Sequence, residues 1–188
     1  MNAKLILASA SPRRKKILAA LGVAFDVVIP EVEEVFYTFD ARRTARENAA
    51  RKSAWCRAQY SECYSLAADT IIEFEGRCVT KARTMDEAIA FLRMFSGKVH
   101  LVYTAVVMAR PQAEPELILA KSSVRFRTLS EDDIRAYVSR VNPMDRAGAY
   151  DIDEQGEMLI DGYTGSRTTI MGLPEEAVRV WLKKEGLM

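Results

Sequence analysis

Histidine and cysteine are scarce in this chain of 188 residues, which contains one histidine and three cysteines. A single histidine excludes a histidine-rich zinc site, and no GxSxG or cysteine signature accompanies His100 to indicate a nucleophilic triad. We therefore expect His100 to be structural. Cys56, Cys63 and Cys78 fit neither a disulfide framework nor a CxxC zinc site, so we expect reduced thiols in a cytoplasmic protein.

Long apolar runs and an excess of charge of one sign are also missing. No stretch approaches the run of about 18 apolar residues that a membrane-spanning helix needs. The 27 Lys and Arg residues balance 26 Asp and Glu residues, and the net charge of +1 argues against a generally basic nucleic-acid-binding protein. The apolar N-terminal segment is too short for a signal peptide, and its basic residues follow it. The length suits one domain, residues 1–188.

Hydrophobic periodicity predicts a mixture of strands and helices. Strands are expected at residues 4–8, 23–29, 65–74, 78–79, 99–109, 116–127 and 158–160. Helices are expected at residues 12–21, 41–60, 84–95, 130–142 and 174–184, several with a capping residue before them or glycine after them. Hairpin and crossover connections among these elements predict an α/β or α+β layer fold, with helices flanking a mixed sheet.

A loop rich in small and hydroxyl residues separates the first predicted strand from the first predicted helix, and it contains Ser9, Ser11, Arg13 and Arg14. The unpaired N–H groups and the dipole of a helix N-terminus favour an anion, and hydroxyl and guanidinium groups add donors. The loop is therefore a candidate phosphate-binding site without a glycine-rich P-loop. An ordinary capped helix with a solvated basic face is the alternative, and the residues alone favour neither.

Acidic residues at two places are candidates for catalysis. Asp69 and Thr70 lie inside an otherwise apolar predicted strand, where a carboxylate loses solvation unless it is paired or bound to a metal. Glu33 and Glu34 follow the second predicted strand, and we expect them near the same sheet edge. Two carboxylates with Mg²⁺ would polarise a phosphate-bound water. The alternatives are an aspartate satisfied by backbone N–H groups and a solvated acidic loop.

Two lysines complete the candidate site. Lys52, in the second predicted helix, and Lys81, after the predicted hairpin, have no evident salt-bridge partner nearby in the sequence. Each alone is typical of a surface lysine. Together with the hydroxyl-rich loop they would neutralise a polyphosphate.

At these residues the chain resembles the Maf family, septum-formation-inhibitor-like nucleoside triphosphate pyrophosphatases, over nearly its full length. The motifs that carry the resemblance occur in the family's order, at residues 7–14, 33–34, 50–52, 68–70, 80–81, 96–97, 147–150, 165–166 and 172–174. The chain departs from the family at Ala82, where proline is usual, and at Asp153, where a glutamine would contact the base.

The resemblance implies an elongated, two-lobed α/β fold with a mixed, twisted sheet and a central cleft, and commonly a homodimer. It also implies hydrolysis of a nucleoside triphosphate to the monophosphate and pyrophosphate, with Mg²⁺ or Mn²⁺. By position, Asp69 and Glu34 become the catalytic and metal-binding carboxylates. The substrate-binding residues then comprise Ser9, Ser11, Arg13, Arg14, Lys52, Thr70, Lys81 and Asp153.

Arg13 and Thr70 favour the subgroup that acts on dTTP and UTP, whereas an ionised Asp153 accepts but does not donate hydrogen bonds and weakens that assignment. We expect the glycine-punctuated segment 147–166 to determine specificity. The predicted reaction is attack of a metal-assisted water on the α-phosphorus, with Asp69 as metal ligand, general base or both.

The rival hypothesis is a non-catalytic nucleotide- or RNA-binding regulator of cell division. Its support is a basic stripe made of residues 13–16 with Arg42, Arg43, Arg46 and Arg51. Nucleic-acid binding of this kind depends steeply on salt. The balanced charge and the intact acids favour the enzyme, and we expect neither membrane association nor a stable nucleic-acid complex.

Overall fold

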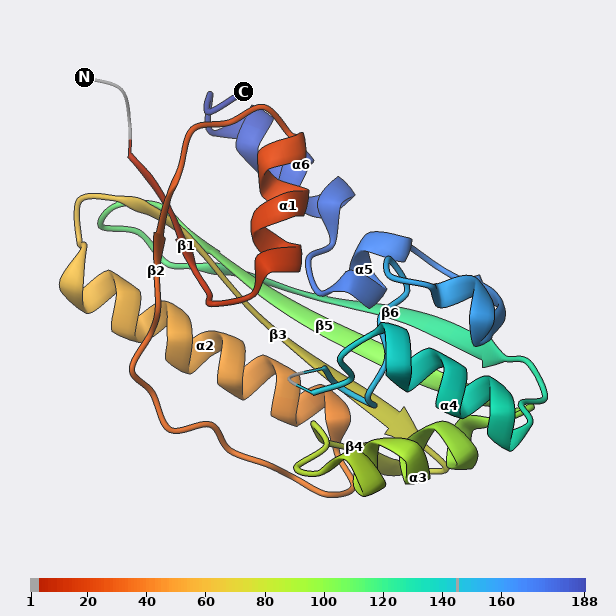
Figure 1. Ribbon diagram of the computed structural model, residues 1–188. Coiled ribbons are helices and arrows are strands. Elements are labelled where there is room, and N and C mark those ends of the chain that lie inside the picture. The colour runs from red at the N-terminus through yellow and green to blue at the C-terminus, as the bar shows by residue number, and fades with distance from the viewer. Residues whose placement is uncertain (1–3, 145) are drawn as a thin grey trace.

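Seven strands form one mixed sheet in the order β2-β1-β3-β5-β6-β7, with β4 paired to β3 (Figure 1). The computed structural model describes residues 4–144 and 146–188. The strands are β1 (Leu5–Ala8), β2 (Asp26–Val28), β3 (Tyr64–Phe74), β4 (Arg77–Val79), β5 (Val99–Ala109), β6 (Glu116–Phe126) and β7 (Ile160–Thr164). β1 runs parallel to β2 and β3, and the other pairs are antiparallel. The predicted mixed sheet flanked by helices is confirmed.

The helices begin largely where the sequence predicts caps. They are α1 (Pro12–Ala20), α2 (Ala41–Gln59), α3 (Met85–Phe95), α4 (Glu131–Arg140), α5 (Arg167–Met171) and α6 (Glu175–Lys184), with a 3₁₀ turn η1 at Gly156–Met158. The side chains of Ser11, Thr84 and Ser130 each accept a backbone N–H in the first turn, which satisfies a group that the helix leaves unpaired. Among the described residues, no helix is both long and apolar enough to cross a bilayer.

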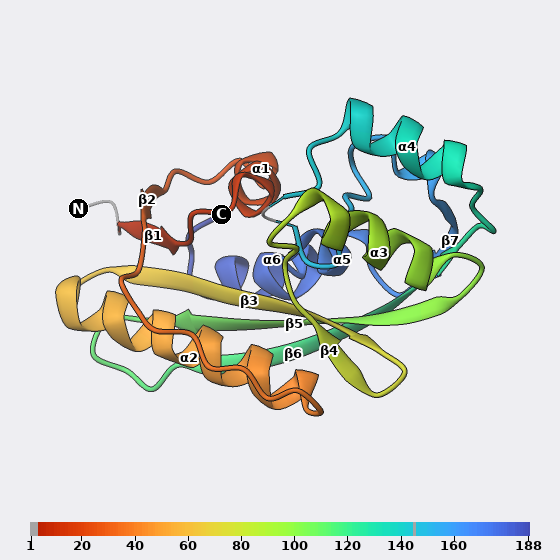
Figure 2. The ribbon, with the colours of Figure 1, turned by 60° about the horizontal axis from the view of Figure 1, so that its bottom comes forward.

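The helices cover the two faces of the sheet unequally. α2 packs on one face, and the other helices lie on the opposite face (Figure 2). On that opposite face, Leu66 of β3 belongs to a core with α1 and α6, whereas Ile72 of β3 belongs to a second core with α3 and α4. Thr70 lies between them in sequence on the same face, because side chains of a strand alternate between faces.

His100 lies in the second core, on β5. It is 1% exposed, its ring centroid is 4.4 Å from that of Phe95, and its Nε2 lies 2.8 Å from Tyr150 Oη. Burial lowers its pKa to about 4, so the ring is neutral at pH 7. These contacts match the predicted structural role. The three cysteines are free thiols, also as predicted.

Two predicted strands differ from the structure. Only Asp26–Val28 of residues 23–29 forms a strand, and its first two side chains are exposed. The predicted strand at 158–160 is wrong: η1 occupies Gly156–Met158, and β7 begins at Ile160. Gln155 has a φ of 53°, and this left-handed conformation before η1 interrupts the extended backbone that a strand requires.

Candidate active site

The candidate site lies where β3 loses its neighbour on one side. β1 pairs with β3 as far as Ala67, and β4 pairs with it from Ile72 onward. On this side, no strand of the described chain pairs with residues 68–71, whereas β5 pairs with all of them on the other side. Asp69 and Thr70 therefore lie at an interruption of the sheet, directly beyond the end of β1.

Asp69 points from β3 toward α2, where it meets Lys52. The Nζ atom of Lys52 lies 2.7 Å from Asp69 Oδ1 and 2.5 Å from Glu34 Oε1, so one ammonium contacts both carboxylates. The side chains of Asp69 and Lys52 are 8% and 12% exposed, whereas that of Glu34 is 57% exposed. The structure thus brings three of the predicted residues together and gives Lys52 the partners that the sequence did not show.

The two carboxylates differ in pKa because they differ in burial. Burial raises the pKa of Asp69 above its ordinary value, although the charge and hydrogen bond of Lys52 oppose the effect. Burial acts on Glu34 in the same sense, but the hydrogen bond and charge of Lys52, with the charges of Lys81 and Arg14, outweigh it and lower the pKa of Glu34. Asp69 is therefore the better proton acceptor of the two, and the charge of Lys81 acts on Glu34.

Arg14 joins three distant segments at the same interruption of the sheet. Its Nη1 donates to Ser9 Oγ at 3.1 Å, its Nη2 to Thr70 Oγ1 at 3.1 Å and its Nε to the carbonyl oxygen of Gly172 at 2.8 Å. Burial lowers the pKa of Arg14, and the charge of Asp69 raises it in part. No carboxylate of the described residues forms a salt bridge with this guanidinium, so its charge is available to an anion near Ser9.

The hydroxyls of the loop before α1 shape the loop itself. Ser9 is buried, and its Oγ accepts the N–H of Ser11 at 3.2 Å. Ser11 Oγ accepts the N–H of Arg14 at 3.4 Å and caps α1. Both bonds hold the first turn of α1 beside the end of β1. Phosphate binding by these two serines stays a prediction.

Arg13 is held by a carboxylate that sequence reasoning missed. Arg13 Nη1 lies 3.1 Å from Asp151 Oδ2, and Arg146 Nη1 lies 3.3 Å from the same oxygen. Asp151 is buried, its backbone N–H donates to Tyr137 Oη, and its Oδ1 accepts the N–H of Asp153. The glycine-punctuated segment therefore reaches Arg13 through Asp151.

The carboxylate of Asp153 is paired with two basic side chains. Lys16 and Arg167 both form ion pairs with it, the latter at 2.9 Å. The hydrogen bond from Lys16 lowers the pKa of Asp153. A contact between Asp153 and a nucleotide base stays a prediction, and in this arrangement the base would compete with two bound cations.

Acidic and aromatic partners occupy much of the basic stripe that supports the rival hypothesis. Arg43 and Arg51 form ion pairs with Glu47 at 3.8 and 3.0 Å, and Arg42 lies over the ring of Tyr103. Two cations of α1 are paired with aspartates, as described above. Four of the eight basic residues of the stripe are therefore engaged in ion pairs within the described part of the chain.

Asn48 is a second residue of the site that the sequence did not reveal. It lies one helical turn before Lys52 on α2, is 2% exposed, and its Nδ2 donates to Asp69 Oδ2 at 3.3 Å. An asparagine inside a helix without a flanking motif carries no chemical signature. Its burial could only be found once the face of α2 that meets β3 was known.

Asp69 and Glu34 supply the oxygen donors that a hard cation prefers. The described residues contain no group of three or more His, Cys, Asp and Glu side chains that could hold a metal ion. Mg²⁺ is commonly bound through one or two carboxylates, with substrate phosphates and water completing the octahedron. The two carboxylates that meet at Lys52 Nζ fit that pattern.

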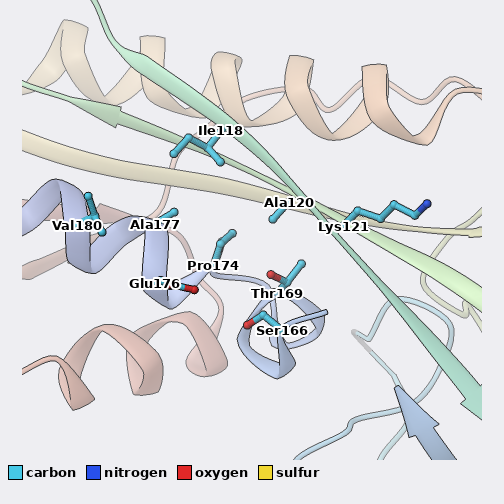
Figure 3. Close-up of a pocket in the computed structure, with 9 residues that line it drawn as sticks. All are labelled: Ile118, Ala120, Lys121, Ser166, Thr169, Pro174, Glu176, Ala177 and Val180. Carbon is cyan, nitrogen blue, oxygen red and sulfur yellow. The ribbon is translucent and has the colours of Figure 1, made fainter. Parts of the chain in front are cut away.

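Two pockets in the described part of the chain lie away from these residues. Figure 3 shows one of about 420 Å³ between β6 and the α5–α6 region, lined by Ile118, Ala120, Lys121, Ser166, Thr169, Pro174, Glu176, Ala177 and Val180. The other, of about 470 Å³, is lined mainly by residues of α2 and by Leu117. Neither contains a predicted site residue, and the expected central cleft stays a prediction.

The fold is similar to that of a protein of known structure. A solved structure of the Ham1 protein of Staphylococcus aureus superposes with a TM-score of 0.56 at 13% identity, covering 97% of this chain and 99% of that one. At this identity the likeness shows the fold alone.

The family follows from sequence comparison. The family model described as Maf-like protein matches residues 4–185, and the chain belongs to this family. The dTTP/UTP pyrophosphatase of Thermotoga maritima is 34% identical over 185 residues, 97% of this chain and 90% of that protein. The dTTP/UTP pyrophosphatase of Syntrophomonas wolfei is 38% identical over 182 residues, 96% of each chain. The predicted family resemblance is confirmed.

Proposed function

We propose that this chain hydrolyses dTTP and UTP to the nucleoside monophosphate and pyrophosphate. The observation that carries the proposal is the convergence of Asp69, Glu34 and Lys52 beside the loop of Ser9 and Arg14. Relatives that carry the name dTTP/UTP pyrophosphatase align with nearly the whole chain, which supports the choice of substrate.

In the proposed reaction, the oxygen of a water forms a bond to the α-phosphorus. The bond from that phosphorus to the oxygen bridging to the β-phosphorus breaks, and pyrophosphate leaves with its electron pair. Asp69, whose pKa is raised by burial, accepts the proton of the water. Lys52, Lys81 and Arg13 are assigned to the charge that develops on the leaving pyrophosphate.

A divalent cation, Mg²⁺ or Mn²⁺, is part of the proposal. Asp69 and Glu34 would hold it, and it would supply a bound water of lowered pKa and screen the phosphate charge. The family resemblance supports a homodimer, and the three cysteines without a disulfide framework support a cytoplasmic location. A solution mass equal to one chain of 21.1 kDa would remove the dimer from this proposal.

The test is Asp69→Asn assayed with dTTP, UTP and Mg²⁺. Asparagine keeps the shape of the side chain but accepts no proton, so we expect turnover to fall by about 10²- to 10³-fold, the range seen when one transition-state partner is removed. Asp161→Asn is the matched control, because Asp161 is an exposed residue of β7 paired with Arg125. Turnover of Asp69→Asn near that of the parent, with the fold intact, would contradict the mechanism.

Hydrolysis in H₂¹⁸O tests the position of attack. Attack at the α-phosphorus places the label in the monophosphate, whereas attack at the β-phosphorus places it in pyrophosphate. The rival hypothesis predicts instead RNA binding that weakens steeply with salt and is indifferent to Asp69.

A further inference from the structure

Polar side chains on one face of α2 bind the segment that precedes this helix. Thr44, Asn48 and Lys52 recur every four residues, so they lie on one face of α2. Thr44 Oγ1 accepts the N–H of Tyr37 at 3.1 Å, and Lys52 contacts Glu34. We refer to Thr44, Asn48 and Lys52 as the α2 ladder. The segment that carries Glu34 belongs to no helix or strand. Its backbone is therefore bound by side chains of the α2 ladder instead of by the hydrogen bonds of a neighbouring strand.

Asn48 makes the central contacts of the α2 ladder. Its Oδ1 accepts the N–H of Val35 at 2.8 Å, and its Nδ2 donates to the carbonyl oxygen of Val35 at 3.0 Å. The remaining N–H of the amide faces Asp69 Oδ2 at 3.3 Å. Turning the amide over would oppose Nδ2 to the N–H of Val35, so these bonds fix one orientation.

The ion pair with Lys52 is a weaker constraint on Glu34 than these backbone bonds. The side chain of Glu34 is 57% exposed although that of Lys52 is 12% exposed, and solvent weakens an ion pair that it reaches. The two bonds from Asn48 to Val35 act on the backbone of the residue that directly follows Glu34. These two bonds between Asn48 and the backbone of Val35 therefore restrict the position of Glu34 relative to Asp69.

We infer that Asn48 is a positioning residue that fixes the separation of Glu34 and Asp69 by binding the backbone of Val35. The inference rests on the proposed function, in which those two carboxylates act together. Asn48 contacts no substrate in this assignment, and its Nδ2 also donates to the carboxylate of Asp69. The positioning effect assigned to Asn48 passes through Glu34, and the cycle below separates it from the contact with Asp69.

The test compares Asn48→Leu with Thr44→Val. Leucine has nearly the volume of asparagine and keeps the buried position filled while removing all three bonds. We expect kcat for dTTP to fall by about 10- to 100-fold, the range typical of residues that orient metal-binding side chains, with little change in KM. Thr44→Val loosens the backbone at Tyr37 instead and is expected to leave kcat close to that of the parent.

Amide hydrogen exchange supplies a readout that does not depend on activity. In Asn48→Leu, exchange at the Val35 amide should accelerate at least about 10-fold while the Tyr37 amide is unchanged; Thr44→Val should show the reverse. An unchanged Val35 amide in Asn48→Leu would overturn the anchor, even if the parent hydrolysed no triphosphate at all.

A double-mutant cycle with Glu34→Gln tests the route of the effect. If Asn48 acts through Glu34, Asn48→Leu should cost less than about 3-fold in kcat in the Glu34→Gln background. A full loss in that background, or an equal loss in Thr44→Val, would show a general loosening of α2 and overturn the inference. So would a parent-like kcat in Asn48→Leu with a rapidly exchanging Val35 amide. If the parent shows no hydrolysis but the exchange pattern holds, the proposed function fails and the anchor stands.

Discussion

Acidification should weaken this fold through one side chain, His100. Its pKa is about 4 in the buried site and about 6.5 in an unfolded chain. Because the folded pKa is the lower one, the unfolded state binds the proton more readily, and stability present above about pH 6.5 is lost as the pH falls toward 4. The two pKa values predict a loss of about 2 kcal/mol between pH 7 and pH 5.

The assay is urea unfolding followed by tryptophan fluorescence, since Trp181 is buried in the first core and should report its exposure. His100 is the only histidine of the chain, so few other groups titrate in this range. His100→Gln keeps a polar group near Tyr150 but does not titrate. Equal losses of unfolding free energy in the parent and in His100→Gln between pH 7 and pH 5 would refute the reasoning.

Two further predictions concern the packing of the candidate site. Gly172→Ala should lower the unfolding free energy by about 1–3 kcal/mol and reduce kcat/KM for dTTP, because φ is +104° and a Cβ would lie 3.1 Å from Thr70 Oγ1. Gly76 has a φ of +77° and nothing within 4 Å of a Cβ. In thermal unfolding, Gly76→Ala should therefore lower the stability only by the free energy needed to hold alanine in a left-handed conformation. Lys52→Met should destabilise the fold by about 3–5 kcal/mol in urea at pH 7, because the buried Asp69 loses its partner. Adding Asp69→Asn should recover part of that loss, and no recovery would contradict the ion-pair explanation.

Much of the fold could be predicted because its elements carry local signals. Ser130 and Asp133 form a complete capping box at the start of α4, and the long run of apolar and β-branched residues in β5 is typical of a buried strand. β7 was misplaced because the segment before it follows neither the helical nor the strand period. Its path depends on a left-handed Gln155 and on a register shift near Arg125, which are tertiary features.

The site could be predicted only as far as its charged groups. Asp69 was found because a carboxylate in an apolar strand is chemically conspicuous, whereas Lys52 alone is typical of a surface lysine and was found through the family motif at residues 50–52. Asn48 was not, because its role comes from packing against the backbone of Val35. In the irregular segment after Tyr150, the sequence does not show which acid turns inward, and it is Asp151 that meets Arg13.

The three acceptors of Arg14 have a consequence for how the protein is made. They come from the beginning, the middle and the end of the chain, and the carbonyl of Gly172 is the last to be synthesised. The residues that complete the first core, including Leu173 and Trp181, follow it. During synthesis, Arg14 therefore lacks one of its three contacts until residue 172 has been made, so this interruption of the sheet is among the last parts of the described structure to be completed.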